Sequence, residues 1–130
     1  MYSARAKKNL LIMDDEQGIR KILEHFLKNE FQVVIKDDGL AGMQWLEEGN
    51  VADLIIADLN MPNLDGKEFL KQLRASNMYS DIPVIILSGS DDSKERIQCL
   101  NAGADDFMIK PFNPMEVLAK INAILRRTQR

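Results

Sequence analysis

The 130-residue sequence has little of what marks a secreted or membrane protein. It contains one cysteine, Cys99, and 6% aromatic residues. A single thiol cannot form an internal disulfide, which fits a reducing compartment. No apolar run approaches the roughly 20 residues that span a bilayer, and acids soon interrupt the apolar run after the basic amino terminus, so it predicts neither a signal peptide nor a membrane span. We therefore expect a cytoplasmic protein that makes no contact with a membrane.

The sequence also lacks a strong charge bias and an internal linker. It has 17 Lys and Arg against 20 Asp and Glu, a net charge of -3. The basic residues near the two ends are too few and too separated to indicate direct nucleic-acid binding. No stretch rich in Gly, Ser or Pro divides the chain, so residues 1–130 are predicted to form a single domain.

Short apolar runs alternate with stretches whose apolar residues recur at helical spacing. The runs are rich in Val, Ile and Leu, as is typical of strands buried on both faces. They comprise residues 10–13, 33–35, 54–57, 84–87 and 107–109. The clearest helical stripes lie within residues 19–27 and 117–125. This alternation predicts a doubly wound α/β domain, with a parallel sheet covered by helices on both faces.

Polar residues follow each apolar run, where ligands bind in sheets of this class. These positions hold Asp14-Asp15-Glu16, Lys36-Asp37-Asp38, Asp58-Leu59-Asn60, Ser88-Gly89-Ser90 and Lys110-Pro111. Carboxylates about 4 Å apart repel by roughly 4 kcal/mol per pair at an effective dielectric near 20. If Asp14, Asp15 and Asp58 meet, they therefore require protons or a cation between them. Mg²⁺ fits a site of few carboxylates, waters and a phosphate better than Ca²⁺ does.

The remaining polar groups suit the chemistry of a phosphoryl group. Lys110 offers a point charge for a phosphoryl oxygen, and the Ser88 hydroxyl offers a hydrogen-bond donor. Asp58 can act as a nucleophile, because carboxylates form aspartyl-phosphate intermediates. The composition of this predicted site thus favours phosphoryl transfer assisted by Mg²⁺.

Four motifs in order resemble the receiver domain of two-component response regulators, the CheY-like family. They are IMDDE, ADLNMPNLDG, ILSGSDD and GADDFMIKPF. The resemblance covers roughly residues 8–128, which we take as the core of the domain. It implies a flavodoxin-like (βα)5 fold with a five-stranded parallel sheet in the order 2-1-3-4-5.

The resemblance also implies a role for each site residue. Asp58 would accept a phosphoryl group from a sensor histidine kinase or a phosphotransfer protein, in a signalling switch that assists its own phosphorylation and dephosphorylation. Mg²⁺, with Mn²⁺ as a substitute, would be bound directly by Asp15 and Asp58, through water by Asp14, and by the backbone carbonyl of Asn60. Ser88 and Lys110 would hold the phosphoryl oxygens.

Two further features are implied by the same resemblance. The Lys110-Pro111 peptide bond is expected to be cis. Phe107 occupies the position of the family's switch aromatic but lacks the hydroxyl of a tyrosine, and we expect phosphorylation to draw Ser88 toward the phosphoryl oxygens and to let Phe107 become buried. The response thus involves Ser88 and Phe107 together.

A charge pattern toward the carboxyl end resembles that of the OmpR/PhoB-like branch, whose receivers form symmetric dimers. It predicts reciprocal pairs across a two-fold axis, namely Arg96 with Glu116, Asp106 with Lys120 and Asp105 with Arg127. The alternative is a solvated charged face, because outer helix surfaces are polar in any case. Exposed ion pairs contribute about 0 to 1 kcal/mol each and would set register more than strength.

Gly66 is interpreted as a turn residue that tolerates positive φ, and Asp65 as a turn or capping residue. Glu16 either assists the site or starts a helix.

A haloacid-dehalogenase-type phosphatase would need an acid where the chain has Asn60. In a flavodoxin-like cofactor binder, Asp14 and its acidic neighbours would repel the flavin phosphate. A degenerate receiver scaffold would lack part of the acidic, hydroxyl and lysine set.

Overall fold

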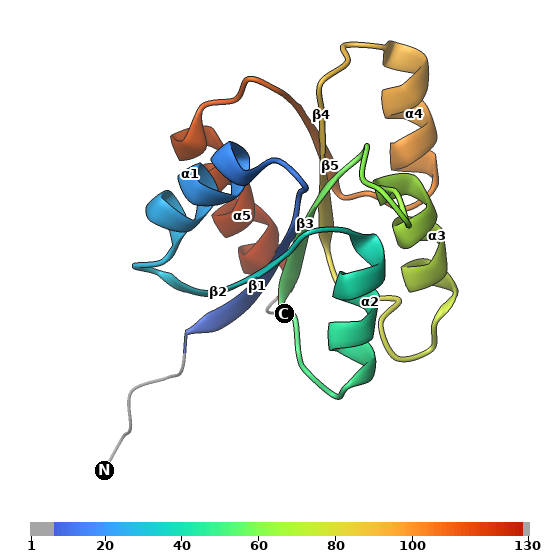
Figure 1. Ribbon diagram of the computed structural model, residues 1–130, viewed down its shortest axis with the longest axis horizontal. Helices are drawn as coiled ribbons and strands as arrows, with labels where there is room; N and C mark the ends of the chain where they lie inside the picture. Colours follow the sequence, from blue (N-terminus) through green and yellow to red (C-terminus); the bar gives the residue numbers. More distant parts are fainter. Residues whose placement is uncertain (1–6, 129–130) are drawn as a thin grey trace.

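A computed structural model describes residues 7–128 as five parallel strands alternating with five helices (Figure 1). In chain order the elements are β1 (Lys8–Met13), α1 (Gln17–Leu27), β2 (Phe31–Lys36), α2 (Gly39–Glu47), β3 (Leu54–Asp58), α3 (Gly66–Ala75), β4 (Val84–Ser88), α4 (Ser93–Asn101), β5 (Asp106–Ile109) and α5 (Pro114–Thr128). The strand order is β2-β1-β3-β4-β5, and every neighbouring pair is parallel. The predicted doubly wound fold and strand order are confirmed.

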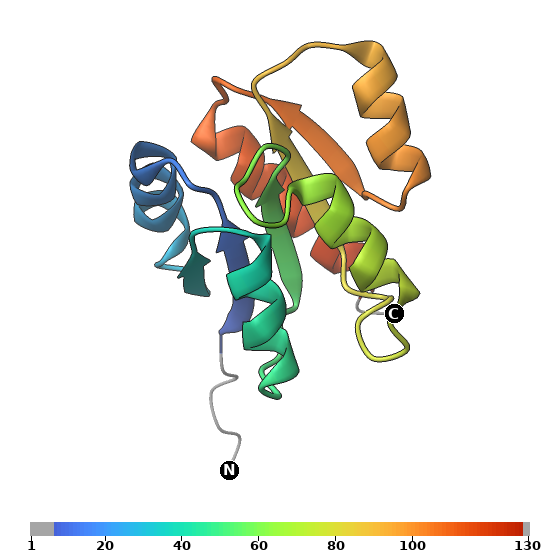
Figure 2. The ribbon, with the colours of Figure 1, turned by 45° about the vertical axis from the view of Figure 1, so that its right-hand side comes forward.

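The helices cover both faces of the sheet, which explains why the strands are apolar along their whole length. Figures 1 and 2 show α1 and α5 on one face and α2, α3 and α4 on the other. Side chains alternate between the two layers, so that Leu11 and Met13 pack toward α2 and α3 while Leu10 and Ile12 pack toward α1 and α5. The fold therefore leaves the strand ends as the places where polar side chains can gather.

The strands extend further than the apolar runs predict. β3 and β4 end on Asp58 and Ser88, so these polar residues belong to the sheet itself. The parallel ladder continues past them, because the amide of Leu59 donates to Leu87 O at 2.7 Å and the amide of Lys110 donates to Ser88 O at 2.7 Å. These backbone hydrogen bonds thus hold the main chain of Asp58, Ser88 and Lys110 within the sheet or at its end, so their side chains extend from a fixed backbone.

No helix within residues 7–128 is both long enough and apolar enough to span a bilayer.

Candidate functional site

Acidic side chains and a lysine meet at the carboxyl ends of β1, β3 and β5. Lys110 Nζ lies 2.9 Å from Asp14 Oδ2, 2.8 Å from Glu16 Oε1 and 3.3 Å from Asp58 Oδ1. The Asp14 and Lys110 side chains are 0% and 11% exposed, so the centre of this cluster is shielded from water. An ammonium group surrounded by carboxylates is the electrostatic core of the site.

The backbone and Arg20 position Asp14 at the end of β1. Its Oδ1 accepts a hydrogen bond from the amide of Glu16 at 2.9 Å. Its main-chain oxygen accepts one from Arg20 Nη1 at 2.8 Å, which ties α1 to the strand end. Its Oδ2 is at ion-pair distance from Lys110, yet no donor is aligned with it for a hydrogen bond. The contact is therefore an ion pair without a directed hydrogen bond, and Oδ2 retains an unused acceptor site.

The surroundings shift the ionisation of the two central groups. Burial raises the pKa of Asp58 from its ordinary 3.8 to about 6; the charge of Asp14 raises it further, and Lys110 partly opposes the change. Burial alone would lower the pKa of Lys110, but the close contacts of its ammonium with Glu16 and Asp14 and the charges of Asp14 and Asp58 outweigh it and raise that pKa. Lys110 is therefore cationic at neutral pH, and Asp58 is largely ionised.

The donor set fits a small divalent cation. Asp14, Glu16 and Asp58 each offer a carboxylate oxygen, and these oxygens lie within 4.8 Å of one another. Oxygen-only donors suit Mg²⁺, and the buried Asp14 Oδ2 accepts no hydrogen bond. The acidic pocket of Asp14, Glu16 and Asp58 is thus of the kind that holds Mg²⁺.

Asp15 does not join this carboxylate group, in contrast to the expected meeting of Asp14, Asp15 and Asp58. Its side chain is exposed, while Glu16 contacts Lys110. The chain leaves β1 after Met13 and bends at Asp15, and the amide of Glu16 folds back onto Asp14 Oδ1 at 2.9 Å, which brings Glu16 rather than Asp15 to the side of Lys110. Glu16, whose role the sequence left open, therefore belongs to the site.

The loop that follows Asp58 is shaped by close backbone packing. A Cβ atom on Gly66 would lie 2.5 Å from Asp58 O and 2.9 Å from the Cα of Leu59. The prediction of a positive φ at Gly66 is wrong, and the residue of this loop with a positive φ is Asn63, at 68°. The Asn63 side chain donates to Asp38 Oδ2 at 2.7 Å. Asp65 caps α3 by accepting from the amide of Glu68 at 2.8 Å, which confirms its predicted capping role.

Gly66→Ala is expected to lower the free energy of unfolding by about 1 to 3 kcal/mol, because the added methyl group meets backbone that cannot yield without moving Asp58. The matched control is Gly18→Ala in α1, where an added Cβ meets nothing within 4 Å and stability should be unchanged or higher. Urea unfolding monitored by circular dichroism measures both. Equal stability of Gly66→Ala and the wild-type protein would contradict the packing argument.

Ser88 and Phe107 lie on adjacent strands beside this cluster. The Ser88 side chain is fully buried, and its Oγ accepts a hydrogen bond from the amide of Ser90 at 3.1 Å. Phe107 is 8% exposed, so the structure already has its ring in the buried arrangement. A phenyl ring has no hydroxyl to hydrate, which favours burial. The Lys110-Pro111 peptide bond is cis.

Several residues of the predicted dimer face form contacts within the chain. Lys120 Nζ lies 2.9 Å from Asp106 Oδ2. Asp105 Oδ2 lies 3.0 Å from Arg74 Nη2 and accepts from the amide of Val84 at 2.8 Å. Arg96 lies 3.7 Å from Asp91, while Glu116 and Arg127 are exposed. Any intermolecular pairing of Asp105 or Asp106 would have to compete with these internal partners.

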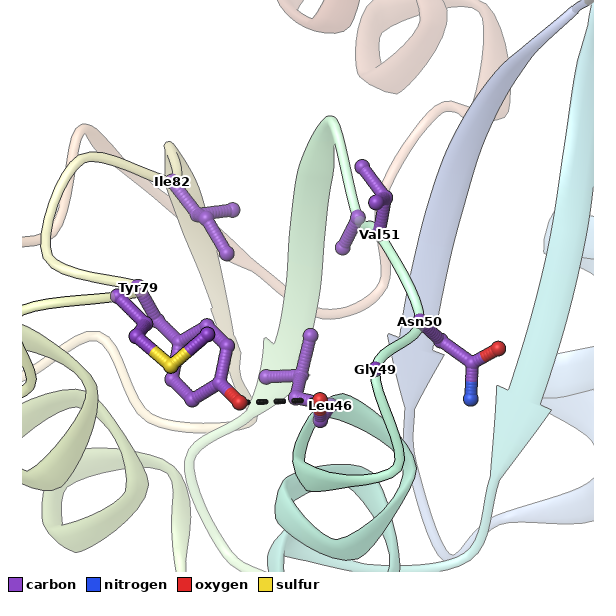
Figure 3. Close-up of a pocket in the computed structure, with 8 residues that line it drawn as sticks. Leu46, Gly49, Asn50, Val51, Tyr79 and Ile82 are labelled. Carbon is purple, nitrogen blue, oxygen red and sulfur yellow. Dashed lines mark hydrogen bonds between the residues drawn. The ribbon is translucent and has the colours of Figure 1, made fainter.

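A separate apolar cavity of about 250 Å³ lies at the opposite end of the sheet (Figure 3). Its lining includes Leu46, Val51 and Ile82, and the Tyr79 hydroxyl donates to Leu46 O at 3.0 Å. None of the predicted site residues lines it. The acidic cluster, and not this cavity, therefore carries the chemistry.

Comparison with known proteins identifies the cluster. Residues 10–122 match the family described as "Response regulator receiver domain". The chain belongs to this family. It is the receiver domain of a two-component response regulator, a signalling module with the acidic pocket Asp14, Glu16 and Asp58.

Similar proteins span the whole domain. The receiver is 41% identical over 125 residues to the "Probable transcriptional regulator ycf27" of Guillardia theta, covering 95% of this chain and 48% of that protein. It is 38% identical over 120 residues to "Response regulator MprA" of Mycobacterium sp. (strain KMS), covering 92% and 51%. MprA is a regulator of the OmpR/PhoB family. The chain thus spans about half the length of these relatives.

Solved receiver structures share the fold. A putative response regulator from Chloroflexus aurantiacus aligns with a TM-score of 0.87 at 29% identity, covering 92% of this chain and 98% of that one. The receiver domain of Francisella response regulator 1452 aligns with a TM-score of 0.84 at 33% identity, covering 94% and 99%.

Proposed function

We propose that Asp58 of this receiver accepts a phosphoryl group from the phosphohistidine of a sensor histidine kinase or a phosphotransfer protein. The observation that carries the proposal is the position of Asp58, a carboxylate 4% exposed at the end of β3, with the Lys110 ammonium 3.3 Å from its Oδ1. The family is phosphorylated by histidine kinases, which supports the choice of donor. Asp58 would be the phosphoacceptor, and Ser88 and Lys110 would act on the transferred group.

In this reaction a carboxylate oxygen of Asp58 forms a bond to phosphorus while the bond between phosphorus and the histidine nitrogen breaks. The nitrogen keeps the electron pair of that bond and later takes up a proton. Asp58 must be ionised to attack, and its pKa of about 6 leaves it mostly ionised at neutral pH. Lys110 can stabilise negative charge on the phosphoryl oxygens, because it stays cationic and lies beside the nucleophile. The domain thereby assists its own phosphorylation, and a water molecule could use the same groups in dephosphorylation.

Mg²⁺, with Mn²⁺ as a substitute, is the proposed cofactor. When bound, it neutralises negative charge on phosphoryl oxygens. The carboxylates of Asp14, Glu16 and Asp58 would hold it, given their mutual distances within 4.8 Å. Asp15 and the backbone carbonyl of Asn60 remain proposed ligands from the family resemblance, and Asp15 would have to turn inward to serve. Cys99 is a free thiol, which supports the proposed cytoplasmic location.

The test of the phosphoacceptor is incubation with acetyl phosphate and Mg²⁺, followed by chemical trapping and mapping of the modified residue. We expect one phosphoryl group on Asp58 and none in Asp58→Asn, because the amide is not a nucleophile. The control Asp81→Asn, which removes an exposed carboxylate at the opposite end of the sheet, should be modified like the wild-type protein. Modification of Asp58→Asn at another side chain would refute the assignment.

The proposed output is pairing through the face of α4, β5 and α5. Phosphorylation would have to exchange the internal Asp106–Lys120 contact of 2.9 Å for its intermolecular counterpart. Because such an exchange gains little per pair, a weak dimer that is sensitive to salt is expected. No nucleic acid is expected to bind this chain directly.

Analytical ultracentrifugation tests this output. Beryllofluoride, a phosphoryl mimic, with Mg²⁺ should increase the dimer fraction. Lys120→Glu should reduce that fraction, because the new carboxylate would repel the carboxylate of Asp106 in the partner. The matched control is Lys71→Glu, which reverses an exposed charge on α3 and should dimerise like the wild-type protein. A protein that stays monomeric under all these conditions would instead indicate a solitary receiver that docks to another partner.

A further inference from the structure

The hydroxyl of Ser88 makes its hydrogen bonds to the loop after β4 and to α4 in this structure. Its hydrogen-bond partners within residues 7–128 are Ser90 and Glu95, and neither Asp58 nor Lys110 is among them. Ser88 Oγ lies 3.4 Å from Ser90 O and 3.5 Å from Glu95 Oε1. A serine hydroxyl has one proton to donate, so it can serve only one strong acceptor at a time.

Glu95 reaches Ser88 because of how α4 begins. Asp92 caps this helix by accepting from the amide of Lys94 at 3.0 Å, which places Glu95 in the first turn. The Glu95 side chain is half-buried, and its negative charge helps to raise the pKa of buried Cys99, after the larger effect of burial and against the charge of Lys67. Glu95 therefore lies along the inner side of α4, next to the end of β4.

Ser88 is otherwise well placed to act on a group at Asp58. The two residues end neighbouring strands, since Asp58 pairs with Leu87 in the ladder of β3 and β4. The amide of Lys110 donates to Ser88 O at 2.7 Å, so Lys110 is also adjacent. Rotation about the side-chain bond of Ser88 would carry its hydroxyl between the α4 side and the pocket.

We propose that Glu95 is a positioning residue that holds the Ser88 hydroxyl on the α4 side and competes for its proton with the oxygens of a phosphoryl group on Asp58. This inference rests on the proposed phosphorylation of Asp58. The negative charge of Glu95, 3.5 Å from Ser88 Oγ, attracts the hydroxyl proton, so turning Ser88 toward the pocket gives up this attraction. Both acceptor distances exceed the usual range of about 2.5 to 3.0 Å for such bonds. The restraint is therefore weak, and it sets how readily the active arrangement forms without preventing it.

Beryllofluoride binding to the whole 130-residue chain tests the proposal, with affinity measured by calorimetry in excess Mg²⁺ at a protein concentration that keeps the chain monomeric. Glu95→Ala should bind about three- to tenfold more tightly than the wild-type protein, which corresponds to about 0.7 to 1.4 kcal/mol. Glu95→Gln keeps an acceptor but loses the charge and should show a smaller gain. Asp91→Asn neutralises an exposed carboxylate in the same region that does not contact Ser88, and should change affinity less than either variant.

A double-mutant cycle with Ser88→Ala separates action through Ser88 from a general effect of charge or packing. In the Ser88→Ala background, Glu95→Ala should leave the affinity unchanged. An equal gain with and without Ser88, or no gain in either Glu95 variant, would overturn the proposal. Failure of the proposed function would look different, because the wild-type protein would not bind beryllofluoride or Asp58→Asn would bind it equally well. Either result would also refute the proposed competition, since no phosphoryl oxygens would then be held at Asp58.

Discussion

Replacing Lys110 with methionine is expected to tighten Mg²⁺ binding at least about tenfold while destabilising the metal-free protein. Its ammonium lies 2.8 to 3.3 Å from the three carboxylates that would hold the ion. Two unit charges about 4 Å apart interact by roughly 4 kcal/mol at an effective dielectric near 20. Lys110 and Mg²⁺ therefore compete for the same oxygens, and about a third of that repulsion already equals the 1.4 kcal/mol that corresponds to tenfold in affinity.

The stability of the same variant should move in the opposite direction when metal is removed. Asp14 and Asp58 are 0% and 4% exposed, and loss of Lys110 leaves these buried acids without their cation. Removing one partner of a buried ion pair costs about 3 to 5 kcal/mol. Urea unfolding of Lys110→Met in chelator should show a loss of this order, and saturating Mg²⁺ should restore much of it through mass action.

Lys36→Met is the control for Lys110→Met. Lys36 is the last residue of β2, at the same end of the sheet as Lys110. It forms no ion pair in the part of the chain that the structure describes. Its loss should change Mg²⁺ affinity, measured by calorimetry at pH 8, only slightly. Unchanged or weaker Mg²⁺ binding by Lys110→Met would show that Lys110 and the metal occupy separate positions.

The sequence predicted most of this fold because burial on both faces leaves an unmistakable pattern. Strands such as β3, with every residue buried, read as unbroken apolar runs, and the polar residue that follows each run marks its end. The register of a parallel ladder then brings those ends together, so the sequence alone predicts that Asp14, Asp58 and Lys110 lie close to one another. Strand lengths were less predictable, because hydrogen bonds continue into the polar residues that end the strands.

Details that depend on contacts between distant residues were not predictable. The choice of Glu16 over Asp15 depends on how the chain bends after β1 and brings Glu16 to Lys110. The positive φ occurs at Asn63 and not at Gly66, where it was expected, and Gly66 is needed instead because α3 closely approaches Asp58 O. Likewise Asp105 is bound to Arg74, a partner 31 residues away, and nothing in its neighbouring sequence indicates this.

Asp58→Asn is expected to make the metal-free protein more stable than the wild-type protein at pH 8. Burial, with the charge of Asp14, raises the pKa of Asp58 from 3.8 to about 6, so the folded protein binds this proton more tightly than the unfolded chain does. The resulting contribution to stability is fully present below pH 3.8 and is lost as the pH rises through about 6. A shift of this size corresponds to about 3 kcal/mol, so the neutral amide should gain about 1 to 3 kcal/mol at pH 8, while Lys110 keeps Asp14 and Glu16 as partners.

Urea unfolding from pH 4 to pH 8 in chelator measures this difference, which should be small at pH 4 and grow through pH 6. Mg²⁺ should narrow it at pH 8, because the ion stabilises the carboxylate form and has less affinity for the amide. Asp53→Asn provides the control: Asp53 is a half-buried carboxylate that accepts from the amide of Asn9 at 2.7 Å, so its replacement should lower stability instead. A stability difference between Asp58→Asn and the wild-type protein that does not vary with pH would show that the ionised carboxylate is not the source of the cost. That result would also mean that the buried Asp58 carboxylate carries no free-energy cost for Mg²⁺ binding or phosphorylation to relieve, as our proposal requires.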